Sequence, residues 1–195
     1  MRKPVEYVKF LLHLTRTHGI VRRYFVVNGF DGALTMLGLI MGFMISSPAS
    51  LSVIINACLG AAIALGVSGV SSAYVSEVAE RKRALTKLED AMVCDLQDSA
   101  HGDAARWVPI LIALVNGLAP LVISLLILTP LWLSAAGVPL PLSPLYVSIT
   151  VALILIFLLG VFLGRISEVS WWRSGIQTLL IALVTAILIY LVVGF

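Results

Sequence analysis

Charged residues are scarce in this sequence, and their scarcity excludes an ordinary soluble domain. Lys, Arg, Asp and Glu make up 12% of the 195 residues, whereas 60% are hydrophobic and the mean hydropathy is +1.06. A soluble domain has roughly a quarter of its residues charged, and an aqueous core of this size could not hold so many apolar side chains. We therefore predict an all-α integral membrane protein.

Metal-binding and catalytic signatures are also lacking. The two cysteines, Cys58 and Cys94, do not form a C-x-x-C pair, and no P-loop is present. The histidines, His13, His18 and His101, lie outside the long apolar runs, so no base accompanies a buried serine. The net charge of +3 is small and no basic domain points to nucleic acid. We predict no enzyme activity, no permanently bound cofactor and no nucleic-acid partner.

The first residues lack the pattern of a signal peptide, because no short apolar run leads to a small-residue cleavage site. This fits a multi-pass protein of a prokaryotic plasma membrane. Over residues 4–18, Val5, Val8, Leu11 and Leu12 fall roughly on one helical face. That spacing predicts a short amphipathic helix in the membrane interface.

Five apolar runs are long enough to span a bilayer, which needs about 20 residues per helix. The predicted transmembrane helices cover residues 26–46, 53–74, 108–133, 144–164 and 174–195. Residues 76–106 form the largest polar segment, and their apolar stripe at helical spacing predicts a helical cytoplasmic loop.

Basic residues are missing from two of the four predicted loops and from the end of the chain. All 13 Lys and Arg precede the first span, or lie between the second and third or the fourth and fifth. The positive-inside rule then places the N-terminus in the cytoplasm and the C-terminus outside. An even number of spans would destroy this segregation.

Asp31 is the one acidic residue well inside a predicted span, about 10 Å from its start if the helix begins near Tyr24. A carboxylate at bilayer depth costs a few kcal/mol, so such a residue is a functional candidate. The alternative is a carboxylate near the interface that caps a helix or pairs with Arg22 or Arg23. The residues that share its face by helical spacing are Asn28, Thr35, Gly38 and Gly42.

Small residues mark further helix surfaces. G-x-x-x-G pairs occur at Gly38/Gly42 and Gly160/Gly164, and a stripe of small residues passes through Gly60, Ala64 and Gly66 in the second span. Small residues let helices approach closely. Both packing inside one bundle and a subunit interface agree with this pattern.

Other polar or soft side chains in the predicted spans each allow two interpretations. Met36, Met41 and Met44 are either soft metal ligands or packing residues. Ser72 and Tyr74 end the second span and could line a wet cavity. Asn56 and Asn116 are isolated amides that either join helices or bind a ligand.

The loop over residues 76–106 carries oxygen and imidazole groups suited to a divalent cation, although a solvated charged face would look similar. Glu77 and Glu80 form an E-x-x-E pair. Farther along, Asp95, Asp98 and His101 follow one another at intervals of three residues. With Asp31, the candidate metal ligands are Glu77, Glu80, Glu89, Asp95, Asp98 and His101.

An ordered set of motifs covers the five spans. The set comprises Asn28-Gly-Phe-Asp-Gly-Ala-Leu-Thr35, Ser72-Ala-Tyr-Val-Ser76, Asn116-Gly-Leu-Ala-Pro120, and the segments from Phe157 to Gly160 and from Arg173 to Gly194. Together they resemble the vacuolar iron transporter family. The resemblance implies five helices per subunit, a homodimer with the ion path between subunits, and export of ferrous and related divalent ions in exchange for protons. It also implies that Asp31 lies on that path.

The sequence departs from the family at the end of the second span. Ala73 stands where a glutamate is common, and Gly69-Val70-Ser71 stands where a methionine is common. Glu77, about one turn later, is a candidate replacement carboxylate.

The predicted function is proton-coupled transport of Fe²⁺ or Mn²⁺ out of the cytoplasm by a homodimer in the lipid bilayer. The alternative is a membrane scaffold or regulatory subunit of the same fold that does not transport. The predicted transport path consists of Asp31, Asn28, Thr35, Met36, Gly38, Gly42, Ser72 and Tyr74.

Overall fold

The computed structural model describes residues 18–46 and 49–194, and it confirms the predicted all-α fold. Five helices are long and apolar enough to cross a membrane, and no strand occurs among the described residues. The helices are α2 (His18–Ile45), α3 (Leu51–Met92), α4 (Ala100–Ala135), α5 (Pro144–Ile166) and α6 (Trp171–Val193). The predicted interfacial helix over residues 4–18 lies outside the described part of the chain, apart from its last residue.

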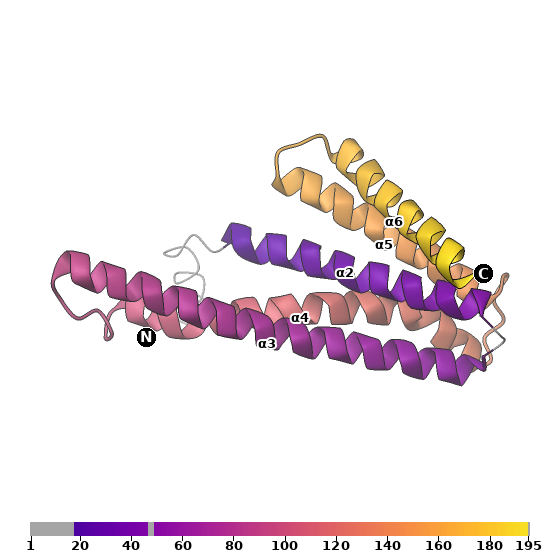
Figure 1. Ribbon diagram of the computed structural model, residues 1–195, viewed down its shortest axis with the longest axis horizontal. Helices are drawn as coiled ribbons and strands as arrows, with labels where there is room; N and C mark the ends of the chain where they lie inside the picture. Colours follow the sequence, from indigo (N-terminus) through magenta and orange to yellow (C-terminus); the bar gives the residue numbers. More distant parts are fainter. Residues whose placement is uncertain (1–17, 47–48, 195) are drawn as a thin grey trace.

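The polar segment over residues 76–106 is mostly helical, as predicted, and its helices are continuations of α3 and α4. The helix α3 continues without a break to Met92, where Val93 leaves the helix in the left-handed conformation with φ 52°. The next helix begins at Ala100, and the Ser99 hydroxyl caps it by accepting from the amides of His101 and Gly102. At 1.5 Å per residue α3 is about 60 Å long, twice the hydrocarbon thickness of a bilayer. Its second half is therefore too long to lie within the same bilayer, and Figure 1 shows it projecting with the start of α4 past the other helices.

The bundle is built on the antiparallel pair α3 and α4, with α2 packed against both and the α5–α6 hairpin against α2 (Figure 1). Apolar side chains of α2 fill the centre, because Met36, Leu37 and Ile40 are at most 1% exposed. They pack in one cluster with buried residues of the other helices, among them Cys58, Ile127, Leu131, Ile156 and Ala182.

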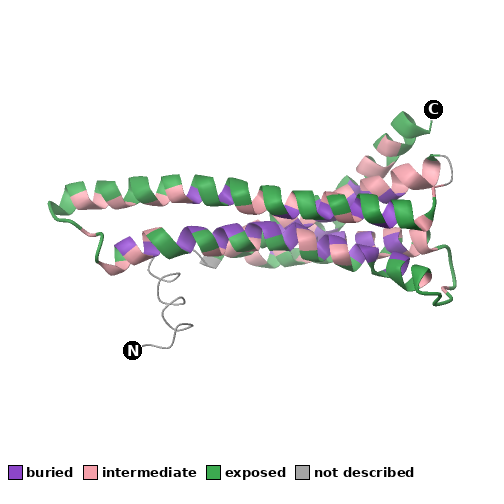
Figure 2. Ribbon diagram, turned by 90° about the horizontal axis from the view of Figure 1, so that it is seen from below, coloured by how far each residue is buried: buried purple, intermediate pink, exposed green. Residues whose placement is uncertain are grey.

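Many large apolar side chains remain outside this core. In α6 only Gly175 and Ala182 are buried, and many of its large apolar side chains, among them Leu180, Val184 and Leu188, are exposed. The extension of α3 and α4 is mostly exposed or intermediate, whereas buried residues concentrate in the other part of the bundle (Figure 2). Such exposed apolar area is what a lipid solvent requires.

Helices cross most closely where both sides are small. A Cβ atom on Gly117 of α4 would overlap the Gly66 carbonyl oxygen and the Val70 side chain of α3. On α5, a Cβ atom on Gly164 would lie 2.9 Å from Trp171 Cα and from Ser174 Cβ, both on α6. The Gly160/Gly164 pair therefore packs inside one chain. Of the two interpretations of that motif, packing within the bundle is the one that the structure supports.

Candidate functional site

Asp31 lies at the middle of α2, deeper than the sequence suggested. Its neighbour Gly32 packs on α4, where an added Cβ atom would come within 2.8 Å of Pro120 Cα. Pro120 is 12 residues from the start of the apolar run 108–133, or about 18 Å along the helix. Because a hydrocarbon core is about 30 Å thick, Asp31 is level with its central region. The Asp31 side chain is nevertheless exposed, because no other described helix covers it.

The other described helices cover the face that carries Asp31 only in part, since Asp31 is exposed and Thr35, Gly38 and Gly42 are half-buried. The hydroxyl of Thr35 donates to the backbone carbonyl of Asp31 at 2.8 Å, so it is satisfied within α2. A Cβ atom on Gly38 would meet only the Ile189 side chain at 3.5 Å, and one on Gly42 would meet nothing within 4 Å. This G-x-x-x-G pair thus has unfilled space beside it, unlike Gly160 and Gly164.

Met36 does not share this open face. Its side chain is fully buried among Leu37, Ile40 and the other core residues. Met36 lies five residues after Asp31, which at 100° per residue turns it to the opposite side of the helix. Its thioether therefore packs the core and does not line a path beside Asp31.

Asn28 forms part of a polar junction between three helices. The Asn28 amide donates to the backbone carbonyl of Tyr24 at 2.9 Å and also to the side-chain oxygen of Asn116 in α4. Asn116 is buried, and its amide donates to the Gly69 carbonyl of α3 at 2.8 Å. Asn116 is thus the link that joins α2, α3 and α4, and the position of Asp31, one turn from Asn28, depends on it.

We expect Asn116→Ala to lower the free energy of unfolding by about 1–2 kcal/mol, the usual contribution of two interhelical hydrogen bonds in a membrane. Denaturation in mixed micelles measures this loss. Asn56→Ala is the matched control, because Asn56 is exposed and forms no side-chain hydrogen bond with any described residue. Equal stability of the two variants would show that the junction does not hold the bundle together.

Glu77 occupies a different environment from Asp31. It is 5% exposed, and its carboxylate lies 3.6 Å from Arg81 Nε and accepts from the Tyr24 hydroxyl at 3.5 Å. Arg81 offsets its charge, and Tyr24 ties it to α2. Glu77 therefore joins α2 and α3 by polar contacts, and its side chain does not lie on the open surface with Asp31.

The polar end of the α3 span faces outward. Ser72 is exposed and donates to the Gly69 carbonyl at 3.4 Å, and Tyr74 is 46% exposed. Ser68 and Ser71 are exposed as well. The hydroxyl groups of Ser68, Ser71 and Ser72 thus lie on an exposed surface of α3.

The acidic side chains of the extension are spread out in the part of the chain that the structure describes. No group of three His, Cys, Asp or Glu that could hold a metal ion occurs among residues 18–46 and 49–194. Glu89 accepts from the Leu96 amide at 3.1 Å, and Asp95 accepts from the Gln97 amide at 2.9 Å, so both shape the 93–99 turn. The remaining predicted ligands, Glu80, Asp98 and His101, are exposed.

Sequence reasoning missed two features of this site. It treated Asn116 as an isolated amide and did not pair it with Asn28, although antiparallel packing of the third span against the first could have suggested a partner. It also did not foresee the groove between the extensions of α3 and α4, because Lys82 and Arg106 are far apart in the chain.

Two comparisons with known proteins bear on this arrangement. The pattern of the VIT family matches residues 83–194, from the extension of α3 to the end of α6. An uncharacterized protein of Methanocaldococcus jannaschii is 32% identical over 173 residues, which cover 87% of each chain. No solved structure matches the chain significantly.

Proposed function

Because the chain belongs to the VIT family, we propose that it transports divalent transition-metal ions across a membrane. The family is one of metal transporters and not of enzymes. The specific proposal is that Fe²⁺ or Mn²⁺ leaves the cytoplasm in exchange for protons. Two copies of the chain would form the ion path between them.

The observation that carries the proposal is the exposed carboxylate of Asp31 in the middle of an apolar helix. A charged side chain facing lipid at this depth is costly, so such groups face a water-filled cavity or a partner. No described residue of the same chain covers Asp31. A second copy packed against the open face of α2 would remove the carboxylate from lipid and build a polar path at once.

Two-fold packing on this face would bring two Asp31 carboxylates toward each other. Two like charges at one site repel, so one of them would hold a proton in the empty state. A divalent cation that enters would neutralise both and displace the proton. Carboxylate oxygens suit such cations, and the same pair would therefore couple metal to proton movement.

Acidic residues at the tip of α3 would supply the ions. An open groove of about 360 Å³ at the tip of α3 is lined by acidic residues and a thiol, namely Glu89, Asp90, Cys94 and Asp95. A surface of one sign raises the local concentration of counter-ions without a fixed site. This role needs no cluster of three ligands within one chain.

Reconstitution in liposomes tests the proposal. Entry of Fe²⁺ or Mn²⁺ and lumenal pH are followed together, with sealed protein-free liposomes as the reference. Metal entry with opposing proton movement supports the antiporter. A folded dimer that moves no divalent ion would contradict it and favour a membrane scaffold.

We expect Gly42→Leu to weaken dimerisation and to leave the fold of each chain unchanged. The new side chain has free space in the chain itself, because a Cβ atom at Gly42 meets nothing within 4 Å. It would fill the space that the partner helix needs. Mass measurement by light scattering in detergent gives the fraction of dimer.

The matched variant is Gly60→Leu, on α3, where a Cβ atom also meets nothing within 4 Å. If Gly60→Leu dissociates the dimer and Gly42→Leu does not, the subunits join through α3 and the proposed path beside Asp31 is wrong.

A further inference from the structure

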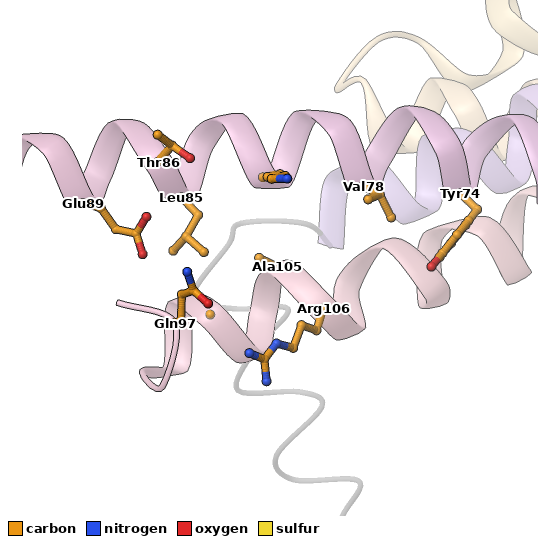
Figure 3. A pocket seen from close by; sticks show the side chains of 10 residues that line it. Tyr74, Val78, Leu85, Thr86, Glu89, Gln97, Ala105 and Arg106 are labelled. Atoms are coloured by element: carbon orange, nitrogen blue, oxygen red, sulfur yellow. The ribbon is translucent and has the colours of Figure 1, made fainter. Parts of the chain in front are cut away.

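A groove separates the extensions of α3 and α4 beyond the membrane, and we infer that it binds the phosphate headgroup of an anionic phospholipid. Its volume is about 480 Å³. Tyr74, Val78, Leu85 and Glu89 line it from α3, and Gln97, Ala105 and Arg106 line it from the turn and α4 (Figure 3). We call it the α3–α4 groove.

The charges of the α3–α4 groove favour an anion. Lys82 and Arg106 are its two cationic residues; both are exposed, and neither forms an ion pair with any described residue. Its single carboxylate, Glu89, already accepts from the Leu96 amide at 3.1 Å. Two cationic residues without an ion pair to a described residue thus line a space whose single carboxylate is engaged by the turn, and the Arg106 side chain points away from α3 (Figure 3).

The register of the two helices gives the height of these groups above the membrane. The bond from Asn116 to the Gly69 carbonyl aligns α4 with α3, so Arg106, ten residues before Asn116, is level with Ala79. Arg106 therefore stands between the levels of Tyr74 and Lys82, which are about 12 Å apart along α3.

These heights match a phospholipid better than a soluble anion. Tyr74 and Trp107 are exposed aromatic residues at the end of the apolar runs, where aromatic rings usually mark the edge of the hydrocarbon. The headgroup region above that edge is about 5–8 Å thick in each leaflet. Arg106 falls within it, and the long Lys82 side chain reaches it from above.

The floor of the groove also fits an amphiphile. Val78 lies on the membrane side of Lys82 and gives the groove an apolar surface there, and Leu85 and Ala105 line it farther from the membrane. Gly102 lets the Gln97 carbonyl approach the start of α4 so closely that a Cβ atom at Gly102 would overlap it, and both residues line the groove. A lipid can thus enter from the membrane side, with its glycerol region near Val78 and its phosphate near Lys82 and Arg106. Basic pockets between helices at this height are a known mode of binding anionic headgroups.

Native mass spectrometry of the full chain in detergent tests the inference. Phosphatidylglycerol and phosphatidylcholine are titrated separately, and the bound lipids per chain are counted. We expect one phosphatidylglycerol per chain to remain bound, and phosphatidylcholine to bind more weakly. In the double variant Lys82→Gln/Arg106→Gln the affinity for phosphatidylglycerol should fall about thirtyfold, since each basic residue contributes about fivefold.

The matched control is Arg83→Gln/Lys87→Gln. It removes the same charge from exposed positions of the same helix that do not line the groove. The control should bind phosphatidylglycerol like the wild type. An equal loss in both double variants would mean general attraction of the basic extension and would overturn the site. Retention of the wild-type affinity by Lys82→Gln/Arg106→Gln would overturn it as well.

Competition distinguishes the source of the phosphate. Inorganic phosphate and glycerol 1-phosphate at millimolar concentration should not displace phosphatidylglycerol. If either displaces it fully, the site takes a soluble phosphate and the lipid assignment is wrong. The test does not depend on transport, so its result is independent of the proposed metal specificity.

Discussion

Replacement of Asp31 by asparagine is expected to abolish proton-coupled metal movement in liposomes while leaving a folded protein. Asparagine keeps the shape of the side chain but carries no charge and cannot exchange a proton with a metal ion. We expect the rate of Fe²⁺ or Mn²⁺ entry to fall by about tenfold or more, because loss of 1.4 kcal/mol of cation binding already gives tenfold. The lumenal pH should no longer change when metal is added.

The exposed position of Asp31 makes this variant informative. The side chain takes no part in the core, so the loss of its charge should not destabilise the chain. Removal of a carboxylate from an apolar surface should instead leave the thermal stability unchanged or increase it. A mobile or misfolded variant would therefore not explain a loss of transport.

Two controls complete this experiment. Asp31→Glu keeps the charge and should retain part of the activity. Thr185→Val changes an exposed hydroxyl of α6 that donates only to the Ile181 carbonyl of its own helix at 2.9 Å, and it should leave transport unchanged. Full pH-dependent transport by Asp31→Asn would show that the path lies elsewhere in the protein.

The largest effect on stability is expected from Gly117→Ala. A methyl group there would overlap the Gly66 carbonyl oxygen and the Val70 side chain, and would lie 2.9 Å from the Val70 amide nitrogen. Backbone atoms cannot turn aside as a side chain can, so α3 and α4 must separate. Overpacking of this kind costs about 1–3 kcal/mol, and more where backbone must move.

The separation would also stretch the hydrogen bond from the neighbouring Asn116 to Gly69. We therefore expect a loss near the upper end of that range, measured by denaturation in mixed micelles. Gly19→Ala is the matched control, since a Cβ atom at Gly19 of α2 meets nothing within 4 Å. Alanine is the better helix former, so this control should be neutral or slightly stabilising. If Gly117→Ala unfolds like the wild type, α3 and α4 do not cross as closely as the structure places them.

Periodic and compositional signals carried the prediction of the fold. In a chain with so few charges, long apolar runs indicate membrane-spanning helices. Such a helix makes its backbone hydrogen bonds within itself, as lipid requires. The five spans were therefore readable without knowledge of any contact. The length of α3 could not be predicted in this way, because Tyr74 and Ser76 mark the end of an apolar run but not the end of a helix. The helix ends at Val93, where the backbone turns left-handed.

The site was only partly readable. Asp31 could be identified from the sequence, because a charged residue within an apolar run is recognisable whichever way its side chain points. The directions of its neighbours depended on packing: Gly38 and Gly42 face open space, whereas Met36 faces the core. Sequence spacing gives the angle between two side chains on a helix, but it does not say which side of the helix meets another helix.

The sequence by itself thus determined that this chain spans a membrane five times and carries one carboxylate among apolar residues. Those properties follow from transfer free energies and helix geometry, which act within a single segment. Only the tertiary structure decided that Asn28 meets Asn116, that Glu77 is held by Tyr24 and Arg81, and that Lys82 and Arg106 share a groove. Contacts between distant segments depend on how small residues such as Gly117 let the helices cross, and that arrangement is a property of the packed bundle.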